Sequence, residues 1–166
     1  MPNTYTLIAS NTVGSGGVSS FTFSSIPSTY TDLLMKCSIR SSADNITAEL
    51  SLNGVKTNMT QRYLQGTGSA AQSGNSTAIN VLENPSTATA STFASADIYI
   101  PNYTSSNYKS ISIDTVTEKN ATDAYSRLVA GLWSNTAAIT SIGLNCSASG
   151  NFVQYSTFYL YGIKNS

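Results

Sequence analysis

Short runs in which apolar and polar residues alternate are the feature that most constrains the fold of this chain. The clearest run covers residues 108–117, Tyr-Lys-Ser-Ile-Ser-Ile-Asp-Thr-Val-Thr, and residues 33–40 alternate in nearly the same way. Side chains of a β-strand point by turns to the two faces of a sheet, so each run gives one apolar and one polar face. No stretch keeps the helical period of about 3.6 residues over three turns. The sequence therefore predicts an all-β protein.

Turn signals separate the expected strands at intervals of about 8–12 residues, which is typical of a sandwich or barrel. Asn53-Gly54 is a strong hairpin signal between residues 48–52 and residues 55–57. Residues 127–133 read as a buried strand. The other expected strands are residues 5–10, 18–23, 33–40, 79–82, 93–100, 108–117, 138–144 and 156–163. We therefore expect about ten strands in a single antiparallel β-sandwich domain over residues 1–166.

Residues 66–89 are the least regular part of the sequence. Glycine and proline occur there among Ser, Ala, Thr and Asn, and only residues 79–82 have the character of a strand. Loops of this length are usually functional or flexible. We expect an irregular surface loop, inserted into the sandwich between about residues 66 and 89.

Two corners of the sequence echo each other. Ile26-Pro27 is followed by Tyr30-Thr31, and Ile100-Pro101 is followed by Tyr103-Thr104. The two corners could be equivalent crossings in a double Greek key. Alternatively they are unrelated strand ends, because proline has no backbone N–H for the hydrogen-bond ladder and commonly ends a strand. The sequence leaves both interpretations open.

The composition is unusually poor in charge. Charged residues make up 10% of the chain, against about 25% in ordinary soluble domains. The net charge is +0 and the basic residues form no cluster, so we expect no nucleic-acid partner. No apolar run approaches the roughly 20 residues of a membrane span, and the first residues show no secretory signal. We expect a protein made in a cytosol, whose neutral surface packs against other proteins at little desolvation cost.

Little in the sequence could carry chemistry. There is no histidine, which removes the most common general base and metal ligand. Cys37 and Cys146 lack the spacing of a zinc site and lie in alternating apolar runs, so we expect free, buried thiols. No glycine-rich phosphate loop is present. The sequence therefore predicts no catalytic residue, no metal and no cofactor.

A pair of carboxylates is the remaining route to an enzyme, because two such groups can hydrolyse a glycoside. The candidates are Asp97, Asp114, Glu118 and Asp123, and the first two are expected on neighbouring strands. Exposed carboxylates are mostly solvated outer-face residues. The enzyme interpretation is therefore the weakest.

Aromatic residues are the best candidates for a binding surface. Tyr and Trp combine a large apolar area with a polar tip, which favours them at interfaces and on sugars. The candidate interface residues are Tyr99, Tyr103, Tyr108 and Trp133, near expected strand ends and loops. The alternatives are that Trp133 caps the core and that the tyrosines merely fill the surface.

Six segments carry a recognisable pattern, namely residues 5–10, 21–27, 98–103, 131–142, 150–152 and 159–164, which read YTLIAS, FTFSSIP, IYIPNY, GLWSNTAAITSI, GNF and YLYGIK. In these segments the chain resembles small structural proteins of tailed bacteriophages, especially marine and cyanobacterial ones. The resemblance spans nearly the whole chain and involves turns and core positions. It implies a virion component with a jelly-roll-like sandwich, and it carries no defined binding site.

Two non-enzymatic hypotheses follow for a protein made in the host cytoplasm and placed at the virion surface. In the first, the chain is a capsid decoration or cement protein that binds the major capsid protein as a symmetric homo-oligomer. In the second, it is a tail-fibre or receptor-binding head among tail proteins, with residues 66–89 and 102–107 contacting a host surface glycan. A small depolymerase is the third and weakest hypothesis.

Overall fold

The computed structural model describes residues 4–43, 46–83, 88–118, 124–147 and 149–164. These residues form strands, turns and loops and contain no helix, which confirms the all-β prediction. It follows that the described residues include no helix of the length and apolarity needed to cross a membrane.

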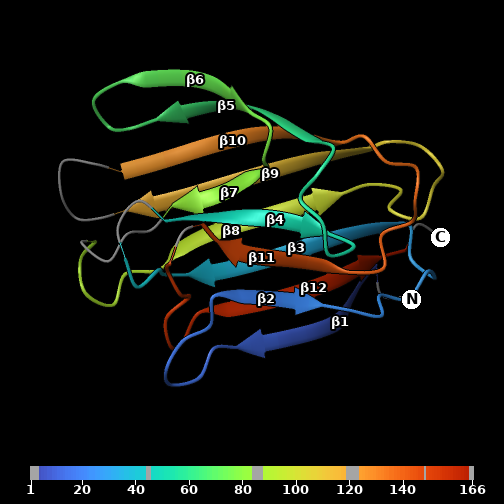
Figure 1. The fold of residues 1–166 in the computed structure, drawn as a ribbon, viewed down its shortest axis with the longest axis horizontal. Coiled ribbons are helices and arrows are strands. Elements are labelled where there is room, and N and C mark those ends of the chain that lie inside the picture. Colours follow the sequence, from blue (N-terminus) through green and yellow to red (C-terminus); the bar gives the residue numbers. More distant parts are fainter. Residues whose placement is uncertain (1–3, 44–45, 84–87, 119–123, 148, 165–166) are drawn as a thin grey trace.

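The described residues form twelve strands in two antiparallel sheets that pack face to face (Figure 1). The large sheet has the order β1 (Tyr5–Thr12), β12 (Thr157–Ile163), β3 (Asp32–Ile39), β8 (Ala94–Ile100), β9 (Lys109–Glu118), β10 (Ala124–Trp133), β5 (Met59–Gly66) and β6 (Ala71–Ser76). The small sheet has the order β2 (Ser20–Phe23), β11 (Ile142–Cys146), β4 (Thr47–Leu52) and β7 (Asn80–Glu83). The predicted β-sandwich is confirmed, with two strands more than the ten expected.

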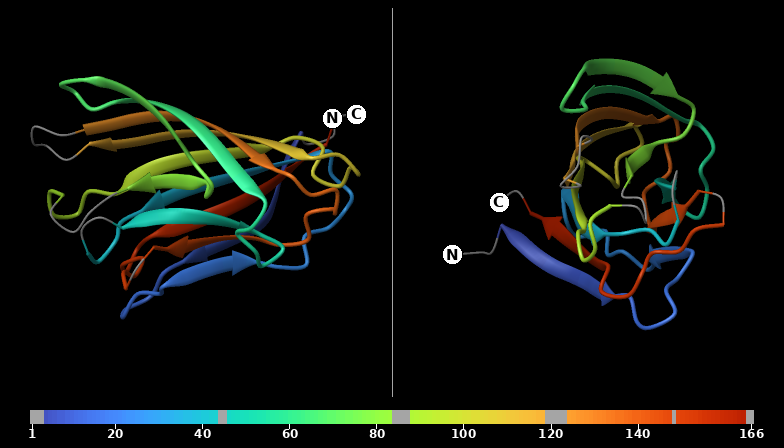
Figure 2. Two further views of the ribbon diagram at one scale, coloured as in Figure 1. Left: turned by 45° about the horizontal axis from the view of Figure 1, so that its top comes forward. Right: turned by 90° about the vertical axis from the view of Figure 1, so that its left-hand side faces the viewer.

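The chain crosses repeatedly between the two sheets. The exceptions are the connections β5–β6, β8–β9 and β9–β10, which stay within the large sheet. The strands of the hairpins β5–β6 and β9–β10 lie side by side and extend the large sheet beyond β8, so that β6 is one free edge and β1 the other (Figures 1 and 2). The large sheet is therefore a sandwich layer of four strands with four more added on one side.

The core lies between the inner faces of the two sheets. The predicted apolar face of residues 33–40 is confirmed, because the four side chains expected on it are at most 4% exposed, namely Leu33, Met35, Cys37 and Ile39. Phe158 of the large sheet stacks on Phe21 of the small sheet with ring centroids 4.4 Å apart, and Phe152 packs edge-on to Phe158 at 5.4 Å. These rings join the two layers.

The segment expected to be an irregular loop, residues 66–89, contains two strands, of which β7 confirms the strand expected at residues 79–82. β6 and β7 lie within it, and residues 84–87 lie outside the described residues. β6 gives no period-two signal because it is the last strand of the sheet and packs against β5 alone, so its residues are small or polar. A Cβ at Gly74 in β6 would lie 2.6 Å from the Tyr63 hydroxyl oxygen on β5, so a larger residue there requires the Tyr63 side chain to shift.

The turn at Asn53-Gly54 forms as predicted, but its second strand does not. The backbone N–H groups of Leu52 and Val55 donate to each other's carbonyl oxygens at 3.0 and 3.1 Å. Beyond Val55 the chain leaves the small sheet for β5. The Asn53 side chain accepts from the N–H of Thr140 at 2.8 Å and donates to the carbonyl of Ala138 at 2.8 Å. These bonds hold a loop where the sequence predicted the start of a strand, and β11 begins only at Ile142.

The two Ile-Pro corners are not equivalent crossings. Ile26-Pro27 lies on the connection from β2 to β3, which passes from the small sheet to the large one. Ile100-Pro101 ends β8 and leads to β9, its neighbour in the same sheet. The two corners are therefore unrelated, and only Ile100-Pro101 lies at a strand end, because β2 already ends at Phe23.

Candidate functional site

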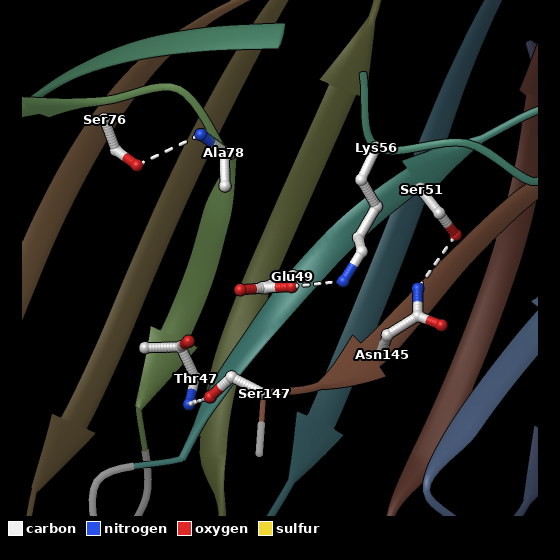
Figure 3. A network of polar contacts seen from close by, with 8 residues as sticks. All are labelled: Thr47, Glu49, Ser51, Lys56, Ser76, Ala78, Asn145 and Ser147. Carbon is white, nitrogen blue, oxygen red and sulfur yellow. Dashed lines mark hydrogen bonds and ion pairs between the residues drawn. The ribbon is translucent and has the colours of Figure 1, made fainter.

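The outer faces of the two sheets differ in character. On the small sheet, polar groups satisfy one another: Lys56 pairs with Glu49 at 2.6 Å, and the Asn145 amide donates to the Ser51 hydroxyl at 3.0 Å (Figure 3). The N–H of Thr47 likewise donates to the hydroxyl of Ser147 at 2.9 Å. The polar groups of these contacts have hydrogen-bond partners within the chain, so the outer face of the small sheet is compatible with exposure to solvent.

The outer face of the large sheet is apolar and aromatic in many places. All large hydrophobic side chains that are exposed and lie in described strands are on this face: Tyr5, Leu7, Leu64, Tyr99, Val116, Leu128, Leu132 and Tyr159. The strand registers show that these side chains point outward, because residues directly opposite each other on neighbouring strands share one face of the sheet. Leu64 and Leu128 are direct cross-strand partners and are 64% and 59% exposed. This face is the candidate functional surface.

Two rows of cross-strand neighbours run over the outer face, and the sizes of their side chains explain where this surface is hollowed. The leucine row consists of Tyr159, Lys36, Asp97, Asp114, Leu128, Leu64 and Ser73, each opposite the next in register. The neighbouring small-residue row consists of Tyr161, Leu34, Tyr99, Ser112, Ala130, Arg62 and Asn75. The two rows pass from β12, next to the β1 edge, across the sheet to its β6 edge.

A hollow of about 740 Å³ lies where small side chains of one row meet large ones of the other. Ser112 and Ala130 form its floor, with Leu128 and Leu64 on one side and Arg62 towards β6. A second hollow of about 240 Å³ shares Ser112 and Ala130 and reaches Tyr99. We call this continuous depression from Tyr99 to β6 the outer trough.

Polar groups at the outer trough have defined roles. The Arg62 guanidinium donates to the carbonyl of Gln61 at 3.0 Å and makes no ion pair within the described residues. The Tyr99 hydroxyl donates to Asp32 at 2.8 Å, and this bond, with partial burial, raises the pKa of Tyr99. The other oxygen of Asp32 accepts from the N–H of Asn102 at 2.9 Å. Tyr99 is therefore held in place at one end of the trough, while a cationic group stands at the other.

The four aromatic candidates divide into two pairs. Tyr99 is 36% exposed on the trough, and Tyr108 is 59% exposed just before β9. Tyr103 and Trp133 are 0% and 1% exposed, so the expectation that they present an interface is corrected. Trp133 lies on the inner face of β10, in agreement with the alternative that it caps the core, and Tyr103 turns inward to bond the carbonyl of Pro27.

Sequence reasoning missed most residues of the outer trough. The interpretation of residues 127–133 as a buried strand is wrong for alternate positions, because Leu128 and Leu132 are exposed on β10. Arg62 and Leu64 lie on β5, a strand that the sequence did not predict. No local signal could have paired Leu64 with Leu128, since their strands come from different hairpins.

Two of the four candidate carboxylates lie side by side on the outer face of the large sheet. Asp97 and Asp114 are cross-strand partners, as expected, and Asp97 pairs with Lys36 at 2.5 Å. Glu118 ends β9 and Asp123 lies outside the described residues. Among the residues that the structure describes, no three His, Cys, Asp or Glu side chains come together in a way that could hold a metal ion.

Comparisons with known proteins give no relative from which a role could be carried over. No protein-family model, curated protein or solved structure matches the chain. Function is therefore argued from the outer trough and from the sequence pattern.

Proposed function

We propose that this protein is a non-enzymatic structural protein of a tailed-phage virion, a decoration or cement protein that binds the major capsid protein through the outer trough. The observation that carries the proposal is the exposed pair Leu64 and Leu128 on a sheet face that no described residue covers. Burial stabilises a leucine side chain by about 1.5–3 kcal/mol relative to exposure. A partner that covers the trough gains this free energy.

The chemistry of the outer trough supports protein binding. Interface cores are enriched in aromatic residues and Arg and depleted in Lys and Glu. The trough combines Tyr99, two leucines and Arg62 over a floor of small side chains that admits a protruding group. The virion as the assembly rests on the resemblance to small phage structural proteins, which also leads us to place the protein at the virion surface.

We also propose that the sandwich is a jelly roll with two added hairpins. When β5–β6 and β9–β10 are set aside, the remaining strands read β1-β12-β3-β8 and β2-β11-β4-β7. Every successive pair of these strands then lies in opposite sheets, apart from β4 and β7. This order supports the proposal, because two Greek keys wound into two sheets alternate between the sheets in the same way.

A receptor-binding head is the second candidate. The observation that favours it is the Tyr99 ring beside the hydroxyl of Ser112, in a trough that also holds the Asn75 amide and Arg62. Rings of this kind stack on sugars, and the neighbouring groups supply hydrogen bonds to sugar hydroxyls. The ligand would be a host surface glycan, reached from a tail fibre.

The copy number per virion, measured by quantitative mass spectrometry against the major capsid protein, tests the proposal. A simple ratio such as one or one third supports a decoration protein on the capsid lattice. A few copies up to a few tens per particle would favour the receptor-binding head, and absence from the particle would overturn both.

Binding to capsids that lack this protein tests the surface itself. Leu128→Lys is expected to abolish co-sedimentation with such capsids, because it places a charge in the trough. Val55→Lys is the matched control, since Val55 is 41% exposed at a turn of the small sheet, away from the trough. Loss of binding in both variants, or in neither, would contradict the outer trough as the contact surface.

A further inference from the structure

β6 is an edge strand without the usual protection against pairing. Its residues, Ala71–Ser76, include no charge and no proline, and its register with β5 has no bulge. β1, at the opposite edge, has a register shift between Leu7 and Ala9, and the edge strands of the small sheet are four residues long. Natural sheets protect their edges with charges, prolines, bulges or short strands. Figure 2 shows β6 at the free margin of the large sheet.

The backbone groups that β6 turns to this margin can be identified from the hairpin. The N–H of Thr67 donates to the carbonyl of Ala70 at 2.9 Å, so these two residues are a hydrogen-bonded pair of the ladder. Hydrogen-bonded and non-hydrogen-bonded pairs alternate along antiparallel strands. Ala71, Ser73 and Asn75 are therefore at non-hydrogen-bonded positions opposite β5. Their N–H and C=O groups point away from β5, towards the free edge.

We propose that β6 is the dimer interface of this protein and pairs antiparallel with β6 of a second copy, with Ser73 at the two-fold axis. In this register Ser73 lies opposite Ser73 of the second copy, and Ala71 lies opposite Asn75. Every outward N–H and C=O group at these three positions then meets a partner. The two-fold axis is perpendicular to the sheet, so the outer faces of both copies lie on the same side.

The side chains also favour a second copy over another occupant. A two-fold axis brings like residues together, which is costly for a charged strand, but β6 carries no charge. The opposed outer-face pairs are Ser with Ser and Ala with Asn, which are small enough for close approach. An isologous interface requires a self-complementary patch, and this register supplies one.

Pairing through β6 joins the two outer troughs. Leu64 is the direct neighbour of Ser73 on β5, and both Ser73 and Asn75 line the trough. The leucine row therefore continues over the two-fold axis into the row of the second copy. The interface is a property of the free protein and does not depend on which assembly the chain joins.

Charge variants at the axis test the pairing. Sedimentation velocity of the wild type is expected to show a mass that rises from 17.5 kDa towards twice that value as concentration increases. Ser73→Lys and Ser73→Glu are each expected to weaken self-association by about tenfold or more, because like charges meet at the axis. A mixture of the two variants is expected to restore dimers, which shows that both are folded. Ser95→Lys, the same change at an exposed outer-face position of β8, is the control.

A cross-link tests the register. Cα atoms of a hydrogen-bonded antiparallel pair lie about 5.5 Å apart, within the range of a disulfide. Ser73→Cys is therefore expected to form a disulfide-linked dimer under mild oxidation, whereas Ser95→Cys is not. A wild type that stays at 17.5 kDa at every concentration, or a dimer that Ser73→Lys leaves intact, would overturn the interface. If the wild type is a monomer that still binds capsids, the dimer interface is overturned while the proposed function stands.

Discussion

The Tyr103 hydroxyl donates a hydrogen bond to the backbone carbonyl of Pro27, and this contact joins the two Ile-Pro corners of the chain. The Tyr103 ring is fully buried, and burial raises the pKa of its hydroxyl. Pro27 precedes β3 and Tyr103 follows β8, which are neighbours in the large sheet. The bond therefore fixes the loops at one end of two central strands.

Tyr103→Phe is expected to lower the free energy of unfolding by about 1–3 kcal/mol, because it leaves the Pro27 carbonyl without this donor. Urea denaturation followed by circular dichroism measures the change. Tyr108→Phe, at a 59% exposed position, is the control and should have no measurable effect. Equal effects of the two substitutions would contradict a structural role for the Tyr103 hydroxyl.

Adjacent residues at the end of β10 are expected to respond very differently to truncation. Trp133 is 1% exposed and faces the core, whereas Leu132 is 38% exposed on the outer face. Trp133→Ala should cost about 3–5 kcal/mol through the cavity that it leaves. Leu132→Ala should change stability by about 0.5 kcal/mol or less. Chemical denaturation of both variants is the measurement, and a reversed order would mean that β10 faces the other way.

The central strands could be predicted from the sequence because one of their faces packs on the small sheet. Leu33, Met35 and Cys37 are buried while Lys36 is exposed, and the period-two pattern records this difference. β5 could not be predicted, because its inner face is polar at Gln61 and Gln65. The Gln65 side chain accepts from Arg127 at 2.6 Å, so polar groups of neighbouring strands satisfy one another there.

The outer trough could not be predicted for a different reason. It needs Ser112, Ala130 and Arg62 to be neighbours, and their registers are set by two separate hairpins. Hairpin pairing alone predicts the contact between β9 and β10. The contact between β10 and β5 depends on a long-range strand pairing, for which the sequence pattern gives no register.

The two free thiols are expected to react at different rates. Cys37 is buried on the inner face of β3, and desolvation raises its pKa strongly. Cys146 is partly exposed, and desolvation raises its pKa to about 11. The thiolate is the reactive form, so both should react slowly with a disulfide reagent at pH 8, and Cys146 before Cys37. Mass spectrometry of the partly modified native protein distinguishes them, and first modification at Cys37 would contradict its burial.

Lys109 is a buried lysine that bonds loop carbonyl groups and forms no ion pair within the described part of the chain. Its ammonium donates to the carbonyl oxygens of Ser105 and Asn107 at 2.7 and 2.5 Å, and its side chain is 1% exposed. Desolvation lowers its pKa below the ordinary value of 10.5. At a pH between the lowered pKa of the folded chain and the ordinary pKa of the unfolded chain, Lys109 is protonated more often in the unfolded chain than in the folded one.

The free energy of unfolding should therefore rise with pH through this window as far as Lys109 is concerned. Buried Tyr103 and Cys37 act in the opposite direction, because their pKa values are raised. The contribution of Lys109 is isolated by subtracting the curve of Lys109→Met from that of the wild type, measured by denaturation between pH 7 and pH 10.5. The difference should increase with pH in favour of the wild type. The exposed Lys164→Met is the control, and a difference that falls with pH would mean that the folded protein stabilises the charged form of Lys109.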